Sequence, residues 1–90
     1  MRAIVTVVGR DRVGIIAGVS ATLARHRINI LDMSQTVLRE DSFAMILLAD
    51  LSEADLSFVE IERILTEEGA RLGVSISIQR EDLFDAMHQV

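Results

Sequence analysis

The order in which strand-like and helix-like patterns follow one another most constrains the fold of this chain. Over only 90 residues, the spacing of the apolar residues switches repeatedly between the period of a strand and the period of a helix. Residues 2–8 are β-branched and almost wholly apolar, whereas residues 13–26 repeat apolar side chains at helical spacing. Three further strands are predicted, over residues 28–39, 43–50 and 74–79. A second helix is predicted before the last of these strands; it begins near residues 52–57 and ends at Gly73.

The order strand, helix, strand, strand, helix, strand predicts a ferredoxin-like βαββαβ sandwich of the α+β class. Right-handed crossovers place both helices on one face of a four-stranded antiparallel sheet. Strands 2–8 and 43–50 are the most continuously apolar, which is typical of central strands buried on both faces. A chain of 90 residues makes a single domain, spanning residues 1–90.

The apolar positions of each helix predict which side packs on the sheet. In the first helix Ile16, Val19 and Leu23 form the expected buried stripe, with Ile15 beside it. Gly18 is expected to let this helix sit close to the sheet. The second helix is expected to bury Phe58, Ile61, Leu65 and Leu72, with Ile64 flanking.

Two helices cover only one face of such a sheet, so the central strands leave apolar side chains on the other. An uncovered apolar face is typical of a partner or ligand site. The C-terminal tail, residues 81–90, is predicted to form a short amphipathic helix with Leu83, Phe84 and Met87 on one side. This tail could cover the face in the same chain or in a second subunit.

Charge and composition exclude several classes of function. The formal net charge of −5 argues against nucleic acid, because such binding neutralises phosphates with Lys and Arg. No apolar run approaches the roughly 20 residues that span a bilayer. The N-terminus enters a strand pattern directly, so no signal peptide is expected and a cytoplasmic location follows. We therefore expect neither nucleic acid nor membrane as a partner.

The chain offers little for catalysis or metal binding. It has no Cys, and its two His, His26 and His88, lie far apart in the sequence without a neighbouring nucleophile and acid. We expect no enzymatic activity, no catalytic residue, no metal site and no cofactor.

The turn GRDRVGI, between the first strand and the first helix, is the most informative stretch. Gly9 and Gly14 bound it, but it lacks the G-K-[ST] of a phosphate loop and the middle glycine of a dinucleotide loop. Asp11 can cap the helix or pair with a ligand ammonium group. Gly14 can allow close helix packing or let a ligand approach the backbone. Both pairs of alternatives remain open from the residues alone.

Asn29 lies where the first predicted helix has ended and the second strand begins. An Asn there can satisfy turn backbone, or its amide can donate to and accept from an α-amino acid. Gln35 on the same strand is a weaker candidate, and Arg10 and Arg12 are expected to be solvated.

Taken together, GRDRVGI, the helix after it and INILDMSQTV resemble the ACT domain, in particular the small stand-alone ACT proteins of prokaryotes, a family of uncharacterised proteins. The resemblance covers the whole chain. It implies a dimer, or a higher homo-oligomer, that binds a small ligand, usually an amino acid, at the subunit interface. The ligand-binding residues it implies are Asp11, Arg12, Val13 and Gly14 of one subunit and Asn29 of its neighbour.

This chain departs from the serine-binding pattern H-x-N-x-P-G that such loops carry in phosphoglycerate dehydrogenase. The matching positions are Gly9, Asp11, Val13 and Gly14, so the resemblance does not imply serine as the ligand. The resulting hypothesis is a regulatory amino-acid-binding domain that acts on a separate protein partner. The alternative is a protein–protein interaction module without a small-molecule ligand.

Overall fold

A computed structural model describes residues 1–10, 13–39 and 41–82 of the chain. The predicted order of elements is confirmed. The elements are β1 (Arg2–Arg10), α1 (Ile15–Arg25), β2 (Asn29–Arg39), β3 (Ser42–Asp50), α2 (Phe58–Leu72) and β4 (Val74–Arg80). In this described part, neither helix is long and apolar enough to cross a membrane.

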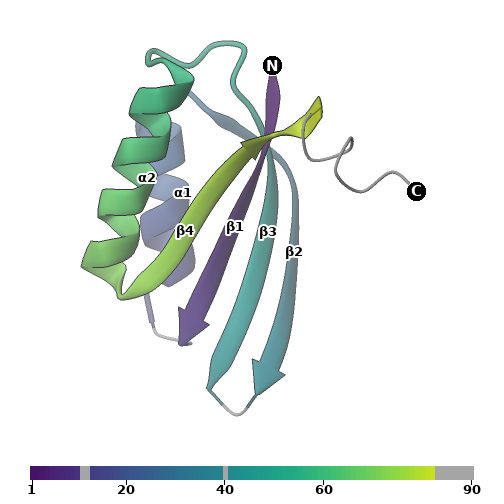
Figure 1. Ribbon diagram of the computed structural model, residues 1–90, viewed down its shortest axis with the longest axis vertical. Coiled ribbons are helices and arrows are strands. Elements are labelled where there is room, and N and C mark those ends of the chain that lie inside the picture. Colours follow the sequence, from purple (N-terminus) through teal and green to yellow (C-terminus); the bar gives the residue numbers. More distant parts are fainter. Residues whose placement is uncertain (11–12, 40, 83–90) are drawn as a thin grey trace.

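The four strands form one antiparallel sheet in the order β2-β3-β1-β4, and both helices lie on the same face of it (Figure 1). The ferredoxin-like fold is therefore confirmed, with β1 and β3 in the centre. The two edges are β2 and β4, which carry more polar side chains than the central strands do.

The core lies between the sheet and the helices. Along β1 and β3 every second residue is buried there, as the two-residue period of a strand requires. The buried side chains of the sheet are Ala3, Val5, Val7, Phe43, Met45, Leu47, Ala49, Ile76 and Ile78, and those of the helices are Ile15, Val19, Thr22, Leu23, Ile61 and Leu65.

Two expectations about burial are wrong. Ile15, not Ile16, begins the buried stripe of α1, because the helix starts at Ile15 and the next position lies about 100° further round its axis. Ile16 is 41% exposed. Among the described residues the central strands are also not buried on both faces: Val8 and Ile46 are 41% and 45% exposed, because neither α1 nor α2 covers the second face (Figure 1).

The second helix begins and ends as its sequence predicts. Ser57 and Glu60 form a capping box, in which each side chain accepts from the other's backbone N–H. Gly73 ends the helix in the left-handed conformation at φ 79°. Ser52, the first residue of the range in which the helix start was expected, does not begin the helix; its N–H and hydroxyl both donate to Asp50.

Small residues set the distances between the helices and their neighbours. A Cβ at Gly18 would lie 3.1 Å from the Leu72 side chain, so Gly18 brings α1 close to α2 and not, as expected, to the sheet. A Cβ at Gly69 would lie 2.8 Å from the Val74 carbonyl oxygen, which is backbone and cannot turn aside.

We therefore predict effects of different size for two Gly→Ala variants. Gly69→Ala should lower the free energy of unfolding by about 1–3 kcal/mol, since the clash outweighs the helix propensity that Ala brings. Gly18→Ala should change it by less than about 1 kcal/mol, because the Leu72 side chain can shift. Urea unfolding of both variants measures this, and equal losses would contradict it.

A polar link joins the two helices. The Thr22 hydroxyl donates to the Gly18 carbonyl oxygen at 3.0 Å and lies 3.2 Å from the Glu68 carboxylate. Arg71 Nε donates to Glu68 Oε1 at 2.7 Å. The hydrogen bond from Arg71 holds the pKa of the Glu68 carboxyl below its usual value, so this group is ionised at neutral pH.

Glu68→Gln should accordingly destabilise the protein in a pH-dependent way. Because the folded pKa is lowered, the carboxylate stabilises the fold above its unfolded pKa near 4.5, and this contribution is lost as the pH falls through the folded pKa. The loss relative to wild type should be about 1 kcal/mol at pH 7 and shrink toward pH 3, as measured by urea unfolding. Glu67→Gln, whose carboxylate is exposed, is the matched control with little effect. A difference that stays constant with pH would rule out this role.

Candidate functional site

The first group of predicted site residues lies at the end of the fold where β1 leads into α1. Asp11 and Arg12 lie outside the described residues. Val13 is fully exposed, and Gly14 holds the N-cap position of α1 with φ 93°. The N-cap position that one of the two alternatives gave to Asp11 is therefore held by Gly14, because α1 begins at Ile15.

The backbone conformation at position 14 explains why this residue is a glycine. A φ of 93° is unfavourable for any residue with a side chain. A Cβ added there would meet no atom of the described residues within 4 Å, so close helix packing does not explain this glycine. The backbone of Gly14 instead faces open space at the start of a helix, where N–H groups lack intrahelical partners.

The second predicted position, Asn29, lies at the other end of α1. The helix ends in a Schellman motif, in which the Ile28 N–H donates to the Leu23 carbonyl and the Arg27 N–H to the Ala24 carbonyl. This motif places Arg27 at the position that Gly usually occupies, with φ 61°. Among the described residues, Arg27 is the only one other than Gly with a positive φ.

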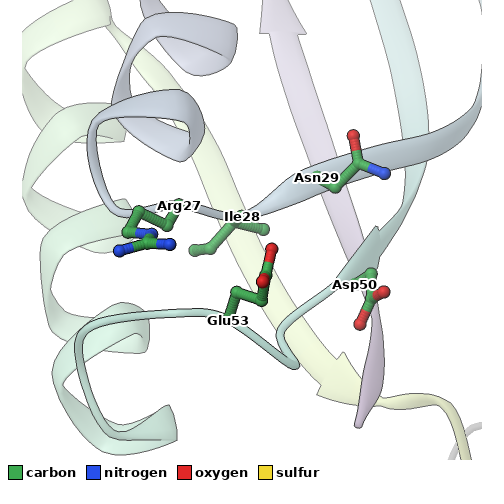
Figure 2. Close-up of a pocket in the computed structure, with 5 residues that line it drawn as sticks. All are labelled: Arg27, Ile28, Asn29, Asp50 and Glu53. Carbon is green, nitrogen blue, oxygen red and sulfur yellow. The ribbon is translucent and has the colours of Figure 1, made fainter.

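A cavity of about 420 Å³ opens at this end of the fold (Figure 2). Two segments distant in the sequence form it, the turn from α1 into β2 and the end of β3 with the connection to α2. Figure 2 shows the Glu53 side chain rising toward Ile28, with Arg27 on one side and Asp50 on the other. The lining residues are Arg27, Ile28, Asn29, Asp50 and Glu53.

Hydrogen bonds fix the walls of this cavity. The hydroxyl and N–H of Ser52 both donate to Asp50, and they hold the pKa of the Asp50 carboxyl below its usual value. His26 Nδ1 lies 3.2 Å from Asp55 Oδ1, and the Asp55 N–H donates to the His26 carbonyl at 3.3 Å. The connection between β3 and α2 is thereby tied to the end of α1.

The lining groups suit a zwitterion. Arg27 offers a guanidinium for a carboxylate, Asp50 and Glu53 offer carboxylates for an ammonium group, and Asn29 can donate and accept. In the part of the chain that the structure describes, no three His, Asp or Glu side chains are grouped to hold a metal ion.

Within one chain the two ends do not meet. The 11-residue helix α1 lies between Gly14 and Asn29 and is about 16 Å long, more than an amino acid spans. Of the predicted residues, the structure thus keeps Val13 and Gly14 together and sets Asn29 apart. Arg10, expected to be solvated, is exposed and lies 3.5 Å from Asp41.

Sequence reasoning missed Arg27, Asp50 and Glu53. Only the pairing of β2 with β3 brings Asn29 opposite Asp50, and only the fold of the connection brings Glu53 under Ile28. The one available signal was Arg27 itself, which follows a helix end where a Gly is common.

Arg27→Gly should stabilise the protein by about 1 kcal/mol, because Gly adopts a positive φ without strain. Arg25→Gly, inside the same helix end, should instead destabilise it by about 1 kcal/mol. Thermal unfolding compares the two. A loss of stability in Arg27→Gly would mean that the guanidinium contributes more to the fold than the strain costs.

Comparison with known proteins agrees with this fold. A sequence model of the ACT domain matches residues 2–79. A UPF0237 protein of Methanopyrus kandleri is 55% identical over 89 residues, which cover 99% of this chain and 98% of that protein. An ACT domain protein from Streptococcus pneumoniae has a TM-score of 0.82 at 41% identity, with 98% of each chain covered.

A more distant structure, the regulatory subunit of aspartate kinase from Thermus thermophilus in its ligand-free form, shares the fold. Its TM-score is 0.66 at 22% identity, covering 87% of this chain and 50% of that one.

Proposed function

Because the chain belongs to the ACT domain family, we propose that it is a regulatory domain that binds an amino acid between the two subunits of a homodimer. The observation that carries the proposal is the separation of two complementary half-sites along α1. One end presents open backbone at Gly14, and the other presents the charged cavity beside Asn29. A ligand that touches both ends needs a second chain.

The sheet supports a simple way to bring the half-sites together. Strand β2 is an edge strand and none of the described strands pairs with its outer side, so this side can pair with another β2. At one end of the sheet Val37 pairs with Phe43, which pairs with Gly9, just before the loop to α1. Antiparallel pairing of two β2 strands about a two-fold axis would bring this end of one copy beside Asn29 of the other.

Apolar side chains along this edge favour the same arrangement. Met33 and Val37 pair with residues whose side chains lie under the helices, yet they are 46% and 72% exposed. Ile16 on α1, on the same side of the sheet, is 41% exposed. Burial of such side chains in a dimer is favourable, at about 25 cal/mol per Å² of apolar surface.

In this proposal Asp11, Arg12, Val13 and Gly14 of one subunit and Asn29 of its neighbour contact the ligand. Backbone N–H groups at the start of α1 favour a carboxylate, and acidic side chains favour the ammonium group. The ligand response is passed to a separate protein, and the domain itself catalyses no reaction. The same fold in a regulatory subunit, that of aspartate kinase from Thermus thermophilus, is consistent with this role.

A thermal-shift screen of the purified protein against the standard amino acids and several nucleotides tests the function. One amino acid, or a few similar ones, should raise the melting temperature by several degrees, since ligand at 100 times its Kd adds about 2.7 kcal/mol. The nucleotides should have no effect. A flat screen at millimolar concentrations would favour the alternative, an interaction module without a small ligand.

A mixing experiment tests whether the site is shared between subunits. Asp11→Ala and Asn29→Ala should each abolish the thermal response, whereas Glu62→Ala, which removes an exposed carboxylate on α2, should keep it. After the two inactive variants are mixed and refolded together, half of the dimers carry one intact site. Calorimetry should then find about a quarter of the wild-type sites. If the mixture shows no ligand binding, the two residues do not belong to a site that is shared between subunits.

A further inference from the structure

The face of the sheet opposite the helices carries a narrow apolar strip. Its residues alternate with the buried ones along β1 and β3, and the pairing of Ile4 with Leu48 and of Thr6 with Ile46 sets them side by side. Val8 and Ile46 are 41% and 45% exposed, and the others are partly buried. We call this the open strip; it comprises Ile4, Thr6, Val8, Ala44, Ile46 and Leu48.

Polar residues border the open strip on both sides. The pairing of β2 with β3 places Asp32, Ser34 and Thr36 along one side, and the pairing of β1 with β4 places Ser75, Ser77 and Gln79 along the other. The apolar part is therefore two strands wide, about 10 Å, which is the width of one α-helix. A second sheet laid on this face would bury both polar rows, which is unfavourable.

The described chain ends at one end of the open strip. Arg2 precedes Ile4 by two residues and so lies on the same face of β1. Its guanidinium binds the Glu81 carboxylate through two hydrogen bonds, of 2.9 and 2.5 Å. Glu81 and Asp82 have helical backbone, and the end of β4 lies beside the N-terminus (Figure 1). The ion pair thus holds the start of the tail at the edge of the open strip.

The sequence of the remaining tail fits this strip. Residues 83–90 read LFDAMHQV, with Leu83, Phe84 and Met87 on one side of a helix and Asp85, His88 and Gln89 on the other. Eight helical residues extend about 12 Å. This length matches the roughly 13 Å from the level of Arg2 to that of Thr6 along β1.

We propose that residues 83–90 form a helix that lies on the open strip of their own chain and packs Leu83, Phe84 and Met87 against Ile4, Ile46 and Leu48. The anchor at Arg2 and the short length of the tail favour the same chain over a second copy. The tail then completes the second layer of the fold and leaves the β2 edge available. This inference does not depend on ligand binding.

Disulfide trapping in the full-length chain tests the proposal, because the protein has no native Cys. The pair Ile46→Cys with Met87→Cys should form an intramolecular disulfide under mild oxidation, at least ten times faster than the control pair Val59→Cys with Met87→Cys. Val59 lies on α2 and is 71% exposed. A disulfide-linked dimer of twice the mass would mean that the tail packs on a second copy. Equal rates of disulfide formation for the two Cys pairs would mean that the tail does not lie on the open strip. Either result overturns the proposal.

Dye binding provides a second measurement without engineered Cys. Phe84→Ser should raise the fluorescence of a dye that binds apolar surface several-fold, because it loosens the tail from the strip. Gln89→Ser, on the outer side of the tail, is the matched control with no rise. Circular dichroism verifies that both variants keep their fold. An unchanged signal in folded Phe84→Ser contradicts the proposal.

Discussion

The antiparallel pairing of β1 with β3 is the constraint on which the rest of the structure depends. It aligns the alternating side chains of two central strands, so that Val5 and Leu47 share one face and Ile4 and Leu48 the other. Both helices pack on the first face, and the core forms there. The second face keeps an apolar strip that the described strands and helices do not cover.

The same architecture separates the two ends of α1. A crossover helix must run the length of the sheet to connect β1 with β2, so the loop before it and the turn after it lie at opposite ends. Each end carries a backbone conformation with positive φ, at Gly14 and at Arg27. At Gly14 the residue suits the conformation, whereas at Arg27 it does not. Such strain is typical of positions where the side chain has a use, and the guanidinium of Arg27 lines the charged cavity.

Much of the fold could be predicted from local patterns. The capping box of Ser57 with Glu60, the helix end at Gly73 and the alternation of Ile76 and Ile78 each depend on residues close in the sequence. The candidate site was harder to predict from the sequence. Asn29 was recognised through its place after a helix, but Asp50 and Glu53 join it only through strand pairing and the path of a connection.

The sequence by itself determined the order of elements and the central position of β1 and β3. These properties follow from periodicity and composition, which are local or additive. Only the tertiary structure decided that Ile15 and not Ile16 is buried, that Gly18 faces α2, and that the cavity beside Asn29 holds three charged groups. The physical reason is that each depends on the rotation of a helix, or on contacts between segments that lie far apart in the chain.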